Sequence, residues 1–226
     1  TNRSLALASQ KMKKIKSFVW EILRILRLGG IVQLILDSLL TRNGWFKSYY
    51  TKQAIDSMGR PLPWCTYSYI RFIGPRLNKG MQVFEFGCGN STLWFADRVM
   101  HVSSVEHDEK WASYVKTIAP ANVTLNFQAL EYGGEYSKMV LLQGRKFDIV
   151  VVDGRDRVNC ARNAIHALHE KGVIVFDNSD RDDYLPAMEL LAETGFRRID
   201  FFGMSPVTAH ENVTTIFYRD YNCLGI

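Results

Sequence analysis

The sequence has few cysteines and no spacing that would bring them together. Four cysteines occur among 226 residues, and no two of them form a C-x-x-C pair. Structural zinc sites and disulfide-rich secreted domains depend on clustered cysteines, so both classes are disfavoured. Free thiols persist in a reducing compartment, which favours a cytoplasmic location.

Acidic residues are scarce in the first quarter of the chain. Residues 1–52 contain ten Lys or Arg and two acids, whereas residues 53–226 contain eighteen basic and twenty-one acidic side chains. The net charge of +5 therefore comes from the N-terminal segment. A nucleic-acid-binding domain usually carries positive charge on its folded surface, so we expect no nucleic-acid partner.

The longest apolar run, residues 18–40, is not continuous. Glu21, Arg24 and Arg27 interrupt its first half, and Gly29-Gly30 divide it. A transmembrane helix needs about 20 predominantly apolar residues in succession. We therefore predict two short amphipathic helices joined at the glycines.

Two interpretations of this N-terminal segment remain open. Its apolar face can pack on the rest of the protein or on a second subunit of a homodimer. Alternatively, the segment lies on a membrane surface, with Lys11, Lys13, Lys14 and Lys16 near anionic head groups, as a peripheral membrane contact. In either case we expect a basic helical extension over residues 1–50, followed by a catalytic domain over 51–226.

The second part of the chain alternates short apolar runs with helical patterns, which is typical of an α/β fold. We predict a doubly wound, mostly parallel seven-stranded sheet that ends in an antiparallel strand pair. The N-terminal helical extension precedes it. The expected strands are 82–86, 102–105, 123–127, 147–152, 172–176, 197–202 and 214–219. The expected helices are 67–77, 92–99, 109–118, 159–170 and 185–194.

A glycine-rich turn follows the first expected strand, in the run V-F-E-F-G-C-G-N-S-T that starts at Val83. Such glycines let the backbone approach a ligand, and the next helix offers free N–H groups to it. The third glycine of a dinucleotide fingerprint is missing, which disfavours a nicotinamide oxidoreductase. Glu106 ends the next strand, where an acid can accept hydrogen bonds from ribose hydroxyls.

These motifs resemble those of class I S-adenosylmethionine-dependent methyltransferases. Glu85, Gly87 and Gly89 match the E-h-G-x-G turn of that family, and Glu106 matches its ribose-binding acid. The resemblance covers about residues 64–220 and implies a Rossmann-like fold with S-adenosylmethionine as cofactor. The cofactor-binding residues that it implies are Glu85, Gly87, Cys88, Gly89, Asn90, Ser91, Thr92, Glu106, His107 and Asp153.

A second group of polar residues follows the fourth and fifth expected strands. Asp153, Asp177 and Asn178 meet at the edge where open α/β sheets bind ligands, and they resemble the metal-binding residues of catechol-type O-methyltransferases. The resemblance implies Mg²⁺ or Ca²⁺ at these three residues, with all three serving catalysis. The sequence departs from that pattern because Arg155 and Arg157 stand where a basic lysine is expected. Arginine stays protonated and cannot act as a general base, so a metal-free role for Asp153 is equally open.

The resulting functional prediction is O-methylation of a small-molecule or glycan acceptor, including a lipid-linked one, by direct displacement. Two alternatives remain. One is a non-catalytic, membrane-associated binding module built on the same fold. The other is an aminopropyltransferase-like enzyme, although such sites contain more acids than this one.

Overall fold

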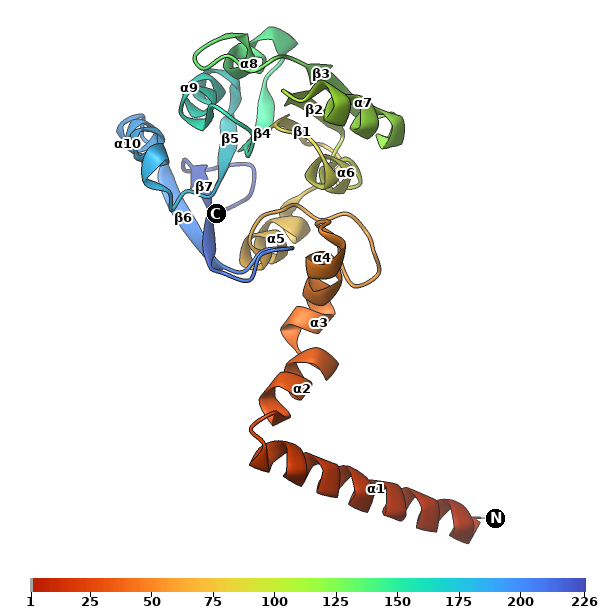
Figure 1. Ribbon diagram of the computed structural model, residues 1–226. Helices are drawn as coiled ribbons and strands as arrows, with labels where there is room; N and C mark the ends of the chain where they lie inside the picture. The colour runs from red at the N-terminus through yellow and green to blue at the C-terminus, as the bar shows by residue number, and fades with distance from the viewer. Residues whose placement is uncertain (1) are drawn as a thin grey trace.

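The computed structural model describes residues 2–226, which form an α/β body and an N-terminal helical arm (Figure 1). Within these residues seven strands make one sheet, in the order β3-β2-β1-β4-β5-β7-β6. The strands β1 to β5 are mutually parallel, and β7 runs antiparallel to β5 and β6. The predicted fold class is confirmed. The strands are β1 (Gln82–Phe86), β2 (His101–Glu106), β3 (Val123–Phe127), β4 (Phe147–Val152), β5 (Leu168–Asp177), β6 (Arg197–Gly203) and β7 (Asn212–Tyr218).

Helices cover both faces of the sheet and also build the arm (Figure 1). The four N-terminal helices are α1 (Asn2–Ile25), α2 (Gly29–Leu36), α3 (Leu39–Asn43) and α4 (Trp45–Thr51). The helices of the body are α5 (Tyr67–Ile73), α6 (Asn90–Ala96), α7 (Glu109–Ile118), α8 (Glu135–Lys138), α9 (Arg157–Ala167) and α10 (Leu185–Glu193), with short 3-10 turns at Gly74–Arg76, Leu141–Gln143 and Asp182–Tyr184.

The core follows the two-residue period of the central strands. In β4, Val150 and Val152 belong to one apolar cluster, and Ile149 and Val151 belong to another. Side chains alternate between the two faces of a strand, so these clusters lie on opposite sides of the sheet. Burial on both faces explains why the central strands are almost entirely apolar.

Some helix boundaries differ from those predicted. The helix expected over 159–170 spans Arg157–Ala167, because Leu168 already pairs with Phe147 as the first residue of β5. The helix expected over 92–99 begins at Asn90, directly after the glycine turn. The antiparallel pair of β6 and β7 lies where the sequence predicts it.

The arm differs from the predicted pair of short helices. Its first helix, α1, is 24 residues long. The break falls between Ile25 and Gly29, where Arg27 adopts a left-handed conformation with φ 59°. Gly29-Gly30 form the first turn of α2, so the predicted junction at the glycines is wrong by about one turn. Among the described residues, no helix combines the length and the apolar character needed to cross a bilayer.

The fourth helix, α4, joins the arm to the body through specific contacts. The indole N–H of Trp45 donates to the carbonyl of Thr208 at 2.8 Å, and the Ser48 hydroxyl donates to the carbonyl of Ile55 at 2.7 Å. Gly44, which precedes the helix, has φ 82°, and a Cβ there would collide with the backbone of Asp56. The arm is therefore connected to the body through a fixed helix.

Candidate active site

The glycine turn lies where the ends of three strands meet. Gly87 has φ 94°, and its N–H donates to the carbonyl of Val105 at 2.8 Å. A Cβ on Gly87 would lie 3.4 Å from the Cα of Gly154, which follows β4. The close approach of these backbones requires small residues at this point, so the turn brings β1, β2 and β4 to one edge.

Glu106 connects the end of β2 to the glycine turn. Its Oε2 accepts a hydrogen bond from the N–H of Cys88 at 3.1 Å. Its Oε1 accepts from the N–H groups of His107 and Asp108 at 2.8 and 2.9 Å. A carboxylate oxygen can accept two bonds, so Oε2 retains an acceptor for a ribose hydroxyl. The ring of His107 lies against the same carboxylate, with Nδ1 2.7 Å from Oε1.

Glu85 is a buried carboxyl group with one free oxygen. Its Oε2 accepts from the hydroxyl of Thr92 at 2.5 Å, whereas its Oε1 is buried without a partner among the described residues. Burial raises the pKa of Glu85 to about 8. A buried acid of this kind is stabilised by a cation, so the site fits the ammonium group of S-adenosylmethionine.

The other residues of the turn hold it in shape. Thr92 is fully buried, and its hydroxyl accepts from the N–H of Gly89 at 3.0 Å. Thr92 therefore acts through Glu85 and the turn. The amide of Asn90 donates to the carbonyl of Ala54 at 2.8 Å, which joins the turn to the segment after α4. Ser91 is half-buried at the start of α6.

Trp111 is a further residue of this site that the sequence analysis did not identify. Its indole N–H donates to the carbonyl of Cys88 at 2.7 Å. A Cβ on Gly89 would lie 3.6 Å from its ring. The side chain is 45% exposed although it lies beside the turn. Its position in the helix that follows Glu106 is the only signal for it in the sequence.

Two acids meet at the ends of β4 and β5, as predicted. Carboxylate oxygens of Asp153 and Asp177 and the Sγ of Cys65 all lie within 4.8 Å of one another. Asp177 is buried and accepts from the hydroxyl of Thr214 at 2.6 Å, whereas the side chain of Asp153 is 23% exposed. Burial and the neighbouring Asp153 raise the pKa of Asp177 to about 8, and burial also raises the pKa of Asp153. Two adjacent carboxylates disfavour each other's ionised form.

Arg157 bonds to the side chains of two predicted metal ligands and to the backbone of the third. Its Nη2 donates to Oδ1 of Asp153 at 2.9 Å. Its Nη1 donates to Oδ1 of Asn178 at 3.2 Å and also to the backbone carbonyl of Asp177. The side chain is only 6% exposed. A divalent cation among these oxygens would lie against a buried guanidinium, so Asp153, Asp177 and Asn178 do not fit the predicted Mg²⁺ or Ca²⁺ site.

The neighbouring arginines do not converge on this edge. Arg155 is exposed, and Arg162 donates to Oδ1 of Asn159 at 2.7 Å on the surface of α9. Of these three arginines only Arg157 is buried, and the positive charge of Arg181 also acts to lower the pKa of Asp153.

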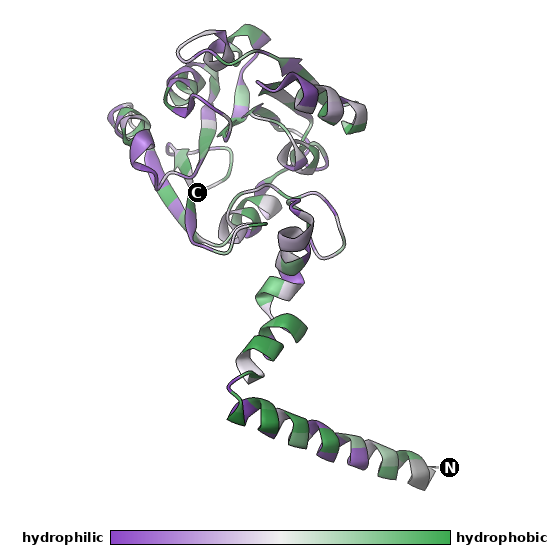
Figure 2. Ribbon diagram, viewed as in Figure 1, coloured by the Kyte–Doolittle hydropathy of each residue, from purple (hydrophilic) through white to green (hydrophobic). Residues whose placement is uncertain are grey.

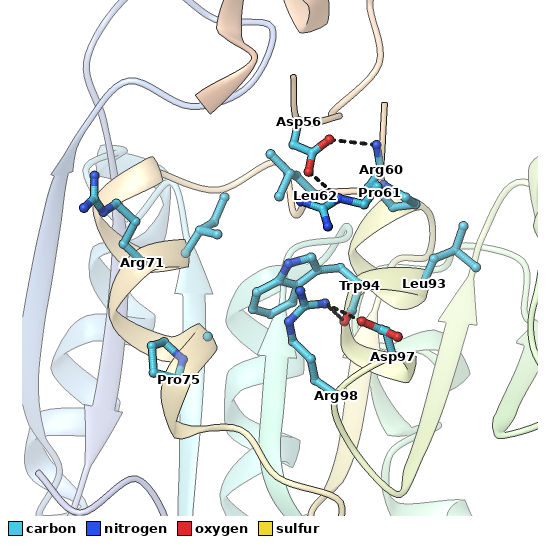
Figure 3. A pocket seen from close by; sticks show the side chains of 12 residues that line it. Asp56, Arg60, Pro61, Leu62, Arg71, Pro75, Leu93, Trp94, Asp97 and Arg98 are labelled. Carbon is cyan, nitrogen blue, oxygen red and sulfur yellow. Dashed lines mark hydrogen bonds and ion pairs between the residues drawn. The ribbon is translucent and has the colours of Figure 1, made fainter. Parts of the chain in front are cut away.

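A cavity of about 720 Å³ lies elsewhere, between α5, α6 and the segment before α5 (Figure 3). The guanidinium of Arg98 stacks on Trp94 at 4.3 Å from the ring centroid, and Arg60 pairs with Asp56 at 2.7 Å. None of the predicted cofactor-binding or catalytic residues lines this cavity. It is therefore separate from the site at the sheet edge.

Comparison with known proteins agrees with this geometry. A family model described as a methyltransferase domain matches residues 84–179, which span β1 to the residues that follow β5. No curated protein matches the chain.

Among solved structures, one similar protein is the precorrin-6y C5,15-methyltransferase of Geobacter metallireducens. It is 16% identical, with a TM-score of 0.50 over 66% of this chain and 87% of that one. A Streptococcus mutans protein assigned as a methyltransferase, in complex with S-adenosylhomocysteine, is 10% identical. Its TM-score is 0.50 over 67% of this chain and 96% of that one. At these identities the structures support the fold.

Proposed function

We propose that this chain is a class I S-adenosylmethionine-dependent methyltransferase, which the methyltransferase-domain match over residues 84–179 supports, and that it methylates a hydroxyl oxygen of a small-molecule or glycan acceptor. The donor, when bound, supplies a methyl group on a positively charged sulfur. The residues of this chain hold the donor, orient the acceptor and remove its proton.

The glycine turn and two acids support donor binding. Glu106 offers a free acceptor on Oε2 beside the N–H of Cys88. Glu85 offers the unpartnered Oε1 beneath the turn. Glu106 contacts the glycine turn at Cys88, and Glu85 contacts it through Thr92, so two separate acids beside one turn suit a ligand that carries both a ribose and an amino group.

The observation that supports oxygen as the target is the pair of acids at the ends of β4 and β5. A neutral hydroxyl must lose its proton as it attacks, and a base with a raised pKa accepts that proton more readily. Asp153 is the more exposed of the two acids, and Arg157 bonds to its Oδ1. Asp153 is then the acid that accepts the proton.

Arg157 has two roles in this proposal. It fixes the orientation of Asp153, and it stabilises the negative charge that remains on the pair of acids. Because its guanidinium lies where a metal would bind, the proposed reaction needs no divalent cation. Most of the rate acceleration then comes from positioning and from electrostatic stabilisation.

The test is methyl transfer from labelled S-adenosylmethionine to a panel of hydroxyl acceptors and their amine analogues. We expect transfer to a hydroxyl that Asp153→Asn slows by about 100-fold or more, as for loss of a general base. The affinity for S-adenosylhomocysteine should be retained. Asp183→Asn, at an exposed acid nearby, is the matched control. Transfer only to amines, or full activity of Asp153→Asn, would contradict the proposal.

A further inference from the structure

The N-terminal arm exposes a large apolar surface. Figure 2 shows hydrophobic ribbon along much of α1 and α2, away from the body. Phe18 and Ile25 of α1 are 68% and 70% exposed, and Leu36 at the end of α2 is 65% exposed. No residue of α2 is buried. Apolar patches of this extent on a soluble protein usually mark a contact with a membrane or another protein.

The shape of the apolar stripe distinguishes between these two partners. At about 100° per residue, the stripe on α1 from Leu5 to Ile25 covers roughly 160° of the helix circumference. A two-stranded coiled coil uses a narrower seam, confined to two positions of each heptad. A helix that lies in a bilayer interface buries a broad face, so the width favours lipid over a second copy of the chain.

The charges on α1 indicate which kind of lipid surface fits. Lys14 and Lys16 lie close to the two edges of the stripe, Lys11 lies within it, and Lys13 lies on the opposite face of the helix. Long lysine stems can lie along an apolar surface while the ammonium groups reach the head groups. The one acid of α1, Glu21, is paired with Arg24. The cations therefore complement an anionic surface.

We propose that α1 and α2 bind in the interface of an anionic lipid bilayer and attach this protein to it without crossing it. No helix in the described part of the chain is suited to crossing a bilayer, which agrees with a helix that lies flat. The contacts of Trp45 and Ser48 fix α4 to the body. The next segment reaches the glycine turn through Ala54 and Asn90. The arm thus connects a membrane surface to the body over a short stretch of chain.

The test is co-sedimentation of the full chain with phosphatidylcholine vesicles, with and without phosphatidylglycerol. We expect binding to the anionic vesicles, weaker binding to the neutral ones, and a decrease as salt is raised. The double variant Ile15→Asp/Ile22→Asp should bind about tenfold or more weakly, because each change removes a buried apolar side chain from lipid. Ser17→Asp/Gln10→Asp adds the same charges on the polar face and is the matched control.

Three results would overturn the proposal. They are no binding to anionic vesicles, equal binding by the two double variants, and a self-associated wild type that Ile15→Asp/Ile22→Asp converts to monomer without any vesicle binding. The last result would assign the stripe to a second copy of the chain. Circular dichroism and S-adenosylhomocysteine binding report whether the body of each variant remains folded.

Discussion

Arg157, the first residue of α9, forms an ion pair with Asp153, which directly follows β4, with Nη2 of the buried arginine 2.9 Å from Oδ1 of the partly exposed aspartate. The same guanidinium donates to Oδ1 of Asn178. The end of β4, the end of β5 and the first turn of α9 are thereby joined by a single side chain. The positive charge that a metal would bring to this edge of the sheet is supplied by the chain itself.

Loss of this guanidinium should destabilise the fold. Removing one partner of a buried ion pair costs about 3–5 kcal/mol because the other charge is left uncompensated. We expect Arg157→Ala to lower the free energy of unfolding by about that amount in urea denaturation. Arg155→Ala, at an exposed neighbour, should change it by less than about 0.5 kcal/mol. Equal effects of the two substitutions on the free energy of unfolding would show that the Arg157 ion pair does not stabilise the fold.

Donor binding should release a proton from Glu85. Because burial raises the pKa of Glu85 to about 8, the carboxyl group is largely protonated at neutral pH in the free protein. An ammonium ligand favours the ionised form and lowers that pKa, so binding expels the proton. The affinity for S-adenosylhomocysteine should therefore rise with pH up to about 8 and then level off.

Calorimetry in two buffers with different ionisation enthalpies measures this proton release. The observed heats should differ between the buffers for the wild type, and the difference should vanish for Glu85→Gln. Identical heats for the wild type would mean that Glu85 is already ionised or lies away from the ligand.

Trp111 should report on the glycine turn. Its indole N–H holds the carbonyl of Cys88, and a neutral hydrogen bond of this kind is worth about 1 kcal/mol. We expect Trp111→Phe to weaken S-adenosylhomocysteine binding by about fivefold and to abolish most of the change in tryptophan fluorescence on binding. Trp20→Phe, in the arm, should leave both unchanged. A fluorescence change that survives in Trp111→Phe would place the ligand elsewhere.

The fold could be predicted because its signals are local. The buried run of β4 and the glycine turn after β1 are visible as short stretches of sequence. The helix break at Arg27 was not predicted, because a glycine pair is the stronger local signal for a break. In the structure, Gly29-Gly30 lie inside a helix instead. The start of β5 at Leu168 depends on pairing with Phe147 across the sheet, which a local pattern does not reveal.

The site was predicted in part for the same reason. Glu85 belongs to the contiguous run that contains the glycine turn, Glu106 ends the next strand, and the structure places both acids at that turn. The side chain of Arg157 points inward because its hydrogen-bond acceptors follow two different strands. The sequence does not reveal these contacts, so it could not exclude a Mg²⁺ or Ca²⁺ site at this edge. Trp111 reaches the turn from a neighbouring helix, and no spacing rule in the sequence connects it to Cys88.

The most direct test of this account is calorimetric titration of S-adenosylhomocysteine into the wild type, Glu106→Ala and the matched control Glu109→Ala. Glu109 is an exposed acid in the first turn of α7. Hydrogen bonds to a charged group are worth about 1.5–3 kcal/mol, so we predict wild-type binding that Glu106→Ala weakens by about 10- to 100-fold and Glu109→Ala leaves unchanged. A folded wild type that does not bind, or a Glu106→Ala variant that binds as tightly as wild type, would contradict the assignment of this edge of the sheet as the donor site.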